Sequence, residues 1–326
     1  MIIDSSCCLA LDIGGTKFEM GLFDLRGSMI GESRRFPVSF EAHNQADVEE
    51  MINLMRTFFN ETPHEGKILS GIGVSICGRV EEKEGIVVLA PNLNWKRVKL
   101  REILGNAFSL PIHVAVDTKQ AATAEKMWGA ARDSENFAWV TLGTGCGSYY
   151  FLNGKPFDGA RGFAGEIGHI TFDEVNGYPC GCGKRGCLET LVAGPAIARQ
   201  GQAIFDRGES RIIRELAGEK PVTPETVVRA MEMGDPSAAQ IINTVMRIFS
   251  MSLGGLVNAL DLEMIVLGGG IVHSITGFIE HIQLQIRDYL IFEETRRELR
   301  VVKESFHNSA LIGAAANFFI KEGIHV

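Results

Sequence analysis

One histidine and three cysteines have the spacing of a metal site. His169 is followed by Cys180, Cys182 and Cys187 in the pattern H-x10-C-x-C-x4-C, with glycines between the cysteines. Three thiolates and one imidazole fill the tetrahedral shell of Zn²⁺ and leave no position for water. The pattern therefore predicts a structural zinc ion that fixes this loop and the orientation of His169. Free thiols or a disulfide are the alternative.

Three glycine-rich turns follow the ends of expected strands, where backbone N–H groups can converge on a phosphate. In the first turn Thr16 adds a hydroxyl, Lys17 adds positive charge, and Asp12 could hold Mg²⁺ through water. Each turn alone fits a plain hairpin or βα turn equally well. The three together favour nucleotide binding, although none matches a Walker or dinucleotide-binding pattern. The residues of these turns are Asp12, Gly14, Gly15, Thr16, Lys17, Gly143, Thr144, Gly145, Gly268, Gly269 and Gly270.

Four polar residues are candidates for acid–base chemistry and for binding hydroxyl groups. Asp117 follows an expected strand and precedes a helix, so its carboxylate either points into a cleft or caps the helix; capping is the simpler interpretation for this residue alone. Glu166 and Glu189 flank the predicted metal loop, which would hold them for hydrogen bonds to sugar hydroxyls; otherwise they are surface acids. Asn92 lies in a turn, where an amide has an ordinary structural role.

Strands and helices alternate along the chain, which predicts an α/β fold. A strand, a glycine turn and a second strand occur at 8–25 and again at 137–152, which suggests a weak internal duplication. Further strands are expected at 28–34, 71–76, 112–116, 263–267 and 299–303. Helices are expected at 45–59, 98–107, 118–130, through most of 192–260, and at 271–290 and 309–322.

Composition narrows the class of protein. The chain has 326 residues and a net charge of −8, and at about 150 residues per domain its length suggests two domains. An acidic chain is not attracted to nucleic acid or to an anionic membrane. No signal peptide is expected, and no apolar run reaches the ~20 residues of a membrane span. Seven cysteines with three of them clustered indicate a cytoplasmic protein with a metal site.

The sequence resembles the ROK family of bacterial sugar kinases and repressors over nearly its whole length. The motifs that carry the resemblance are DIGGTK at 12–17, APNLNW at 90–95, LGTGCG at 142–147, GEIGH at 165–169, CGCGKRGCLET at 180–190 and VLGGG at 266–270. The cysteine segment together with EIGH is the most specific. The resemblance implies a ribonuclease-H-like fold of the actin and hexokinase type, with a cleft between two α/β domains. The expected domains are 1–120 joined by the C-terminal helix 308–326, and 121–307 with the zinc loop.

The resemblance also implies roles for the candidate residues. Asp117 would be the general base on the sugar hydroxyl. Other hydroxyls would be held by Asn92, Glu166, His169 and Glu189, with His169 also a zinc ligand. The ATP phosphates would lie at Gly14, Gly15, Thr16 and Lys17 and at Gly143, Thr144 and Gly145, with the adenosine beside Gly268, Gly269 and Gly270.

The chain departs from the family pattern beside the expected base. The family commonly has Asn-Asp-Ala-Asn where this chain has Val116, Asp117, Thr118 and Lys119. Val116 cannot donate to a sugar hydroxyl, and one such hydrogen bond is worth about 1–3 kcal/mol of discrimination. Nearby, Cys77 replaces the proline of the usual Pro-Gly.

The expected function is transfer of a phosphoryl group from ATP to a hexose hydroxyl, the 6-hydroxyl first, with Mg²⁺ and a structural Zn²⁺. The partners are a small sugar and ATP, and a homodimer or homotetramer is expected. One alternative is a sugar-binding regulatory ROK protein with impaired catalysis, which Val116 favours. Another is an actin-like ATPase without a sugar, which Glu166 and Glu189 disfavour. DNA-binding members carry an N-terminal helix-turn-helix; this chain begins at the first strand, so a repressor role is disfavoured.

Overall fold

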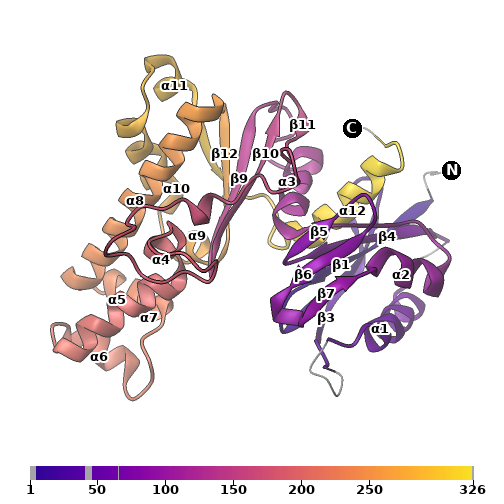
Figure 1. The fold of residues 1–326 in the computed structure, drawn as a ribbon, viewed down its shortest axis with the longest axis horizontal. Coiled ribbons are helices and arrows are strands. Elements are labelled where there is room, and N and C mark those ends of the chain that lie inside the picture. Colours follow the sequence, from indigo (N-terminus) through magenta and orange to yellow (C-terminus); the bar gives the residue numbers. More distant parts are fainter. Residues whose placement is uncertain (1–4, 41–45, 65, 325–326) are drawn as a thin grey trace. The chain divides into compact units, whose positions relative to one another are not determined.

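The computed structural model describes residues 5–40, 46–64 and 66–324 and divides the chain into two compact units. Unit 1 comprises Met1–Asp133 and Glu304–Val326, and unit 2 comprises Ser134–Lys303 (Figure 1). Each unit has a five-stranded mixed sheet with helices, so the α/β class expected from the sequence is confirmed.

The sheet of unit 1 has the strand order β3-β2-β1-β4-β8. Strands β1 and β2 form a hairpin around the first glycine turn, whereas β4 and β8 run parallel to β1. β1 is buried at every residue except Asp12, which is partly exposed, because both faces of the sheet are covered. The bounds are β1 Ser6–Ile13, β2 Lys17–Asp24, β3 Met29–Pro37, β4 Ile68–Ile76, β8 Ile112–Val116, α1 Val48–Glu61 and α2 Leu100–Phe108. Residue 45, the start expected for α1, lies outside the described residues.

A second, three-stranded sheet in unit 1 was not expected from the sequence. It has the order β5-β6-β7, with β5 Arg79–Glu81, β6 Ile86–Ala90 and β7 Trp95–Val98. The 3-10 turn η1 Pro91–Leu93 joins the last two strands and contains Asn92. These strands are too short to show an alternating pattern, and Asn94 and Arg97 have positive φ angles that propensity alone does not indicate.

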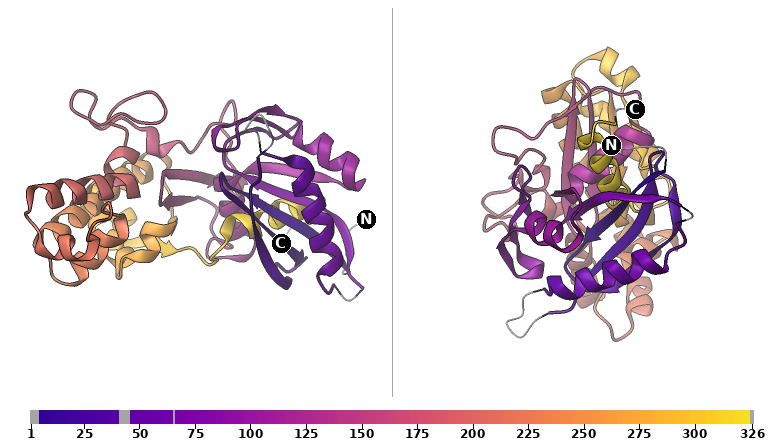
Figure 2. Two further views of the ribbon diagram at one scale, coloured as in Figure 1. Left: turned by 90° about the horizontal axis from the view of Figure 1, so that it is seen from below. Right: turned by 90° about the vertical axis from the view of Figure 1, so that its right-hand side faces the viewer.

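The C-terminal helix α12 Ser309–Lys321 packs against β1, β4 and α3 Asp117–Trp128 within unit 1 (Figures 1 and 2). Small residues permit this close approach, since a Cβ on Gly313 would lie 1.7 Å from the carbonyl oxygen of Gln120. The division expected from the sequence, at 120/121, falls inside α3. The two units instead divide at 133/134 and 303/304, because α3 packs on α12 as one layer of unit 1.

Unit 2 has the sheet order β11-β10-β9-β12-β13. The hairpin β9 Phe137–Leu142 and β10 Cys146–Leu152 repeats the strand–turn–strand pattern of β1 and β2. Its other strands are β11 Lys155–Pro156, β12 Met264–Gly268 and β13 Arg300–Lys303, and its longer helices include α5 Gly194–Arg207, α7 Pro224–Glu232 and the 25-residue α8 Pro236–Leu260. These helices bury a large apolar core that includes Phe249 and Phe278.

The prediction of a single helix at 271–290 is wrong. The segment forms α9 Gly270–Ser274, α10 Phe278–Gln285 and the 3-10 turn η3 Ile286–Tyr289. Gly277 has φ +73° at the start of α10, a conformation that interrupts a right-handed helix. Among the described helices, none combines the length and apolar character of a membrane span.

Candidate functional site

The carboxyl ends of three parallel strands bring polar residues together in unit 1. Ile13 at the end of β1 pairs with Ile76 of β4, which pairs with Val116 of β8. The residues at these strand ends therefore share one edge of the sheet, where parallel α/β sheets commonly bind ligands. Asp12 lies there on β1 and accepts a hydrogen bond of 2.7 Å from the hydroxyl of Ser75. Asp117 lies directly after β8.

The electrostatics of this edge reflect its burial. Burial raises the pKa of the Asp12 carboxyl, and the hydrogen bond from Ser75 opposes that rise. Burial raises the pKa of the Cys77 thiol to about 11, and the nearby charges of Asp117 and Asp12 add to the rise. Cys77 is only partly buried, unlike Cys7 and Cys8 of the core. Two carboxyl groups and a neutral thiol thus lie near one another at the sheet edge.

The first glycine turn closes the β1–β2 hairpin, with the N–H of Gly14 donating to the carbonyl of Lys17 at 3.0 Å. Gly14 and Gly15 do not have positive φ angles, so conformational freedom is not why glycine stands here. Space is the reason at Gly15, since a Cβ would lie 2.5 Å from the Cβ of Asn92. Asn92 therefore packs directly on the expected phosphate turn, next to Thr16.

Asp117 is the first residue of α3 and is partly buried. The N-cap is Val116, and its side chain makes no capping bond. The Asp117 carboxylate instead accepts the N–H of the adjacent Thr118 at 2.7 Å. Asp117 is thus not the N-cap residue of α3, although its carboxylate accepts one N–H group of the first helical turn.

In unit 2, Glu189 lies at the second glycine turn. Its Oε2 accepts the N–H of Cys146 at 3.0 Å, and a Cβ on Gly145 would lie 2.7 Å from the same oxygen. Glu189 is the first residue of the short helix α4 Glu189–Val192, and the chain continues to Gly194, whose N–H donates to the carbonyl of Gly143 at 2.8 Å. Residues 143–146 and the end of the cysteine segment therefore form one compact site.

The third glycine turn lies beside the second. A Cβ on Gly143 would lie 3.5 Å from the backbone nitrogen of Gly270, and one on Gly269 would lie 2.5 Å from the carbonyl oxygen of Leu142. Gly268 is the last residue of β12, which pairs with β9 so that Gly268 is opposite Thr141. Two of the three predicted turns are therefore adjacent in unit 2, with Thr144 in the loop between β9 and β10.

The predicted metal ligands converge. One ligand atom from each of His169, Cys180, Cys182 and Cys187 lies within 4.8 Å of the others. The Sγ atoms of Cys182 and Cys187 are 3.6 Å apart, and Cys180 Sγ is 3.6 Å from His169 Nδ1. Zn–S bonds of 2.3 Å at tetrahedral angles put sulfurs about 3.8 Å apart. The donor set and its spacing fit a four-coordinate zinc ion, and the thiols are not joined by a disulfide.

The segment before His169 is held against strand β10. A Cβ on Gly168 would lie 2.0 Å from the carbonyl oxygen of Cys146, so only glycine permits this approach. His169 Nε2 is 3.8 Å from a carboxylate oxygen of Glu166, while Cys180 Sγ is 3.9 Å from Oε1 of Glu189. The two acids that flank the predicted metal loop in the sequence therefore also border the predicted metal ligands in space.

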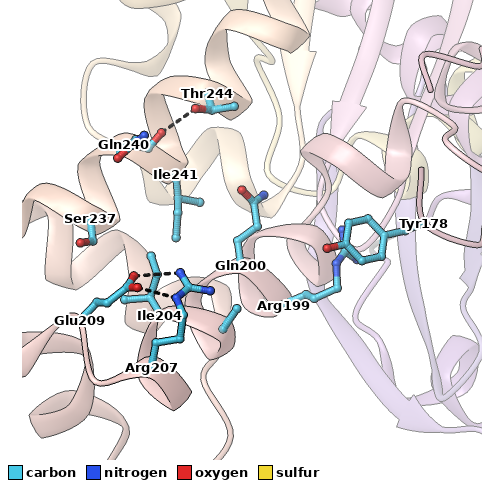
Figure 3. Close-up of a pocket in the computed structure, with 11 residues that line it drawn as sticks. Tyr178, Arg199, Gln200, Ile204, Arg207, Glu209, Ser237, Gln240, Ile241 and Thr244 are labelled. Atoms are coloured by element: carbon cyan, nitrogen blue, oxygen red, sulfur yellow. Dashed lines mark hydrogen bonds and ion pairs between the residues drawn. The ribbon is translucent and has the colours of Figure 1, made fainter. Parts of the chain in front are cut away.

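A separate hollow of about 390 Å³ lies on α5 and α8 of unit 2 (Figure 3). None of the predicted site residues lines it. At its edge Arg199 lies 3.6 Å from the ring centroid of Tyr178, a residue of the loop between His169 and Cys180. Arg199 also donates to the carbonyl oxygen of Thr190 at 2.7 Å. Arg199 thus braces the metal loop from outside, a role that the sequence gave no periodic or motif signal to find.

Comparison with known proteins supports the family resemblance that the sequence motifs indicate. The sequence profile of the ROK family matches residues 8–320. A glucokinase from Halalkalibacterium halodurans is 30% identical over 264 residues, covering 81% of this chain and 80% of that protein. A xylose repressor from Caldicellulosiruptor bescii is 29% identical over 273 residues, which are 81% of this chain and 66% of the repressor.

Among solved structures, the ROK glucokinase from Streptomyces griseus in complex with glucose and AMPPNP superimposes with a TM-score of 0.78. It is 25% identical in sequence, and the match covers 95% of this chain and 98% of the glucokinase. The actin- and hexokinase-type fold implied by the sequence motifs is thereby confirmed. The match across almost the whole chain, together with the glycine turns and the Cys/His cluster, shows that this protein belongs to the ROK family.

Proposed function

We propose that this chain transfers the γ-phosphoryl group of ATP to a hexose hydroxyl, the primary 6-hydroxyl first, with Asp117 as the general base. The observation that carries the proposal is the placement of Asp117 at the same sheet edge as Asp12 and the 14–17 turn. Phosphoryl transfer depends mainly on positioning and charge stabilisation, which such an edge supplies. The similarity to glucokinases supports the same class of reaction.

Different residues would handle the proton, the metal ion and the phosphates of ATP. Asp117 takes the proton from the attacking hydroxyl as the new O–P bond forms and the bond to ADP breaks. Asp12, partly buried and held by Ser75, would hold Mg²⁺ through water, because carboxylate and water oxygens suit this ion. The N–H groups and charge at 14–17 support the ATP phosphates, as do Gly143, Thr144 and Gly145. The turn Gly268, Gly269 and Gly270 borders the adenosine.

The sugar hydroxyls are bound, in this proposal, by Asn92, Glu166, His169 and Glu189. A structural zinc ion at His169, Cys180, Cys182 and Cys187 would keep two of these side chains in place, since His169 is a ligand and Glu189 approaches Cys180. Zinc with four protein ligands supplies no open position for chemistry. Val116 offers no hydrogen bond beside Asp117, so the preferred sugar is expected to make fewer polar contacts there than glucose does in relatives with Asn.

The test is a coupled ADP-release assay over a panel of glucose, fructose, mannose, allose and N-acetylated hexosamines. Wild-type protein is expected to turn over at least one sugar. Asp117→Asn should abolish turnover while sugar binding, measured by calorimetry, largely survives, because the amide keeps the size of the side chain but accepts no proton. Glu102→Gln, an exposed acid on α2, is the matched control and should be neutral. Near-normal turnover in Asp117→Asn would reject the assigned base.

A sugar-responsive regulator without catalysis is the second candidate, favoured by Val116 and by the similarity to a xylose repressor. The same panel separates the two. Sugar binding without ADP release for any hexose supports the regulator and contradicts the kinase. ATP hydrolysis that no sugar stimulates contradicts both and favours an ATPase.

A further inference from the structure

A buried lysine lies in α3 two residues after Asp117. Lys119 is 3% exposed, and its Nζ donates to Oε2 of Glu82 at 2.9 Å. A charged ammonium group removed from water is costly unless an opposite charge compensates it. The Glu82 side chain is itself only 28% exposed, so the pair is much less screened by solvent than a surface ion pair.

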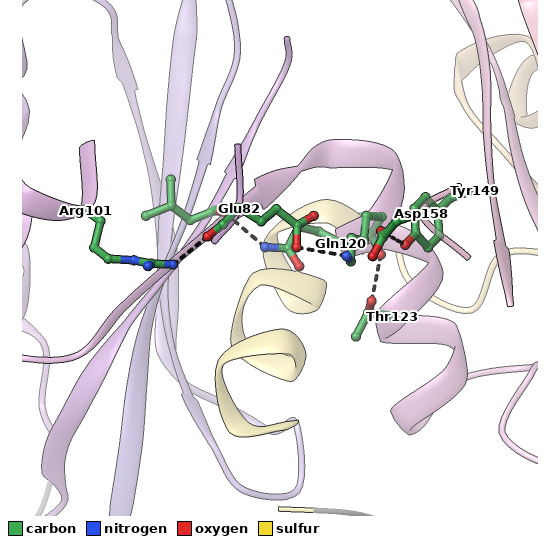
Figure 4. A network of polar contacts seen from close by, with 8 residues as sticks. Glu82, Arg101, Gln120, Thr123, Tyr149 and Asp158 are labelled. Carbon is green, nitrogen blue, oxygen red and sulfur yellow. Dashed lines mark hydrogen bonds and ion pairs between the residues drawn. The ribbon is translucent and has the colours of Figure 1, made fainter. Parts of the chain in front are cut away.

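The turn that carries Glu82 is itself held by a second cation. Arg101 on α2 donates from Nη2 to the carbonyl oxygen of Glu82 at 2.7 Å and from Nη1 to that of Lys83 at 2.6 Å. Its Nε donates to the carbonyl oxygen of Ile112 at 3.1 Å. Figure 4 shows Arg101 and Glu82 on neighbouring elements of unit 1. The 82–85 turn is therefore tied to the beginning of β8 through Arg101, and to the helix after β8 through Lys119.

The β5–β6 hairpin, which contains this turn, leads to Asn92, another polar residue of the candidate site. β6 begins at Ile86, just after the turn, and ends at Ala90, two residues before Asn92. Asn92 packs on Gly15 of the glycine turn. Asp117 and Asn92 thus extend from two segments that the Glu82–Lys119 pair joins. A change in that pair should alter where the carboxylate lies relative to the glycine turn.

We propose that Lys119 is a positioning residue for Asp117, acting through its ion pair with Glu82. This proposal rests on the function proposed above for Asp117. The pair holds the first turn of α3 against the β5–β6 hairpin, so the carboxylate meets the attacking hydroxyl in one orientation. Val116 and Lys119 occupy the two Asn positions of the family's Asn-Asp-Ala-Asn run, so a charge pair restrains the helix in this chain where an amide stands in relatives.

Four variants test the proposal. Lys119→Met removes the charge and keeps the length, Glu82→Gln removes the opposite charge, and Lys119→Arg keeps a cation. Lys99→Met is the matched control, because it breaks a lysine–glutamate pair of the same 2.9 Å length that is exposed on α2 of the same unit. For each variant, kcat and both KM values are measured with the best hexose of the panel, together with amide hydrogen exchange over 117–121.

Lys119→Met and Glu82→Gln are expected to lower kcat by about 10- to 100-fold, the effect of misplacing a reacting group by about 1 Å. The KM for ATP should stay within about threefold, because the 14–17 turn is untouched, and exchange over 117–121 should accelerate. Lys119→Arg should recover most of kcat, and Lys99→Met should match wild type.

Several results would contradict the proposed role of Lys119. Folded Lys119→Met and Glu82→Gln proteins with near-normal kcat would overturn the proposal. A loss of kcat without faster exchange, or with no recovery in Lys119→Arg, would also overturn it, because Lys119 would then act by another route. If Lys119→Met does not fold, Glu82→Gln decides, since it removes the opposite charge at a side chain that is less buried than Lys119 and therefore tolerates the change better. A wild type inactive on every hexose contradicts the proposed function, and the exchange measurement then still decides whether the pair restrains α3.

Discussion

The buried carboxylate of Glu125, near the C-terminal end of α3, offers a sharp test of how unit 1 is stabilised. Glu125 is fully buried, and its Oε1 accepts the N–H of Ser305 at 2.6 Å. Its Oε2 accepts the Ser305 hydroxyl at 2.8 Å and the N–H of Ala130 at 2.8 Å. Ala130 and Ser305 lie within a few residues of the two points where the chain passes between units. This one side chain therefore ties both crossing segments to α3.

Glu125→Ala is expected to lower the free energy of unfolding by about 3 kcal/mol. The N–H and the hydroxyl of Ser305 both lose their charged acceptor. Each lost hydrogen bond costs about 1.5 kcal/mol, the low end of the range, because Ser305 is exposed and water can reach it. The one buried methylene that is lost, Cγ, contributes about 0.8 kcal/mol. Release of a buried carboxylate offsets part of this loss. Ala130 adds little, because its N–H keeps the Ser305 hydroxyl as an acceptor at 2.9 Å.

Urea unfolding followed by circular dichroism measures this loss, and amide exchange at 304–309 locates it. Ser305→Ala removes only the hydroxyl, so a double-mutant cycle with Glu125→Ala should show a coupling of about 1 kcal/mol. Glu125→Gln keeps the shape and should cost about 1 kcal/mol. If the free energy of unfolding of Glu125→Ala is within 0.5 kcal/mol of the wild-type value, the hydrogen bonds to Ser305 do not stabilise the unit, and the reasoning is refuted.

The pH dependence has a definite sign. Burial raises the pKa of Glu125, and hydrogen bonds from Ser305 and Ala130 oppose the rise. The folded state therefore holds this proton more tightly than the unfolded chain. The contribution of Glu125 to stability is greatest below its ordinary pKa, falls as the pH rises from there to the raised pKa, and is constant above it. The advantage of wild type over Glu125→Gln should thus shrink as the pH rises through that window; an advantage that grows contradicts the raised pKa.

Two further predictions concern the candidate sites. Chelation of the metal should release about one zinc ion per chain, make residues 166–189 sensitive to protease and weaken sugar binding in calorimetry; unchanged sugar affinity in metal-free protein would count against the role of the loop. Gly15→Ala should raise the KM for ATP by about tenfold or more, because a Cβ would lie 2.5 Å from that of Asn92, whereas Gly105→Ala, with nothing within 4 Å and a helical position, should leave the KM unchanged and gain about 0.5–1 kcal/mol of stability. An unchanged KM in Gly15→Ala would show that Asn92 moves aside freely.

Local spacing explains what could be predicted. Cys180, Cys182 and Cys187 lie within eight consecutive residues, so any compact loop brings their thiols together. Only His169 lies farther away in the sequence. The glycine turns and their flanking strands are also local features, since a hairpin forms from neighbouring residues. The family motifs extended these local signals to the fold as a whole, and the fold is confirmed. The roles of Asp117 and of the sugar-side residues stay predictions.

The sequence by itself determined the Cys/His cluster, the glycine turns and the strand that precedes Asp117, because each depends on residues close together in the chain. Only the tertiary structure decided the contacts between distant segments: Asn92 on Gly15, Glu189 on the N–H of Cys146, and Lys119 with Glu82. The short strands β5, β6 and β7 likewise owe their pairing to neighbours rather than to their own pattern. Partner choice across long loops is set by packing and charge in the folded chain, and no single stretch of sequence encodes it.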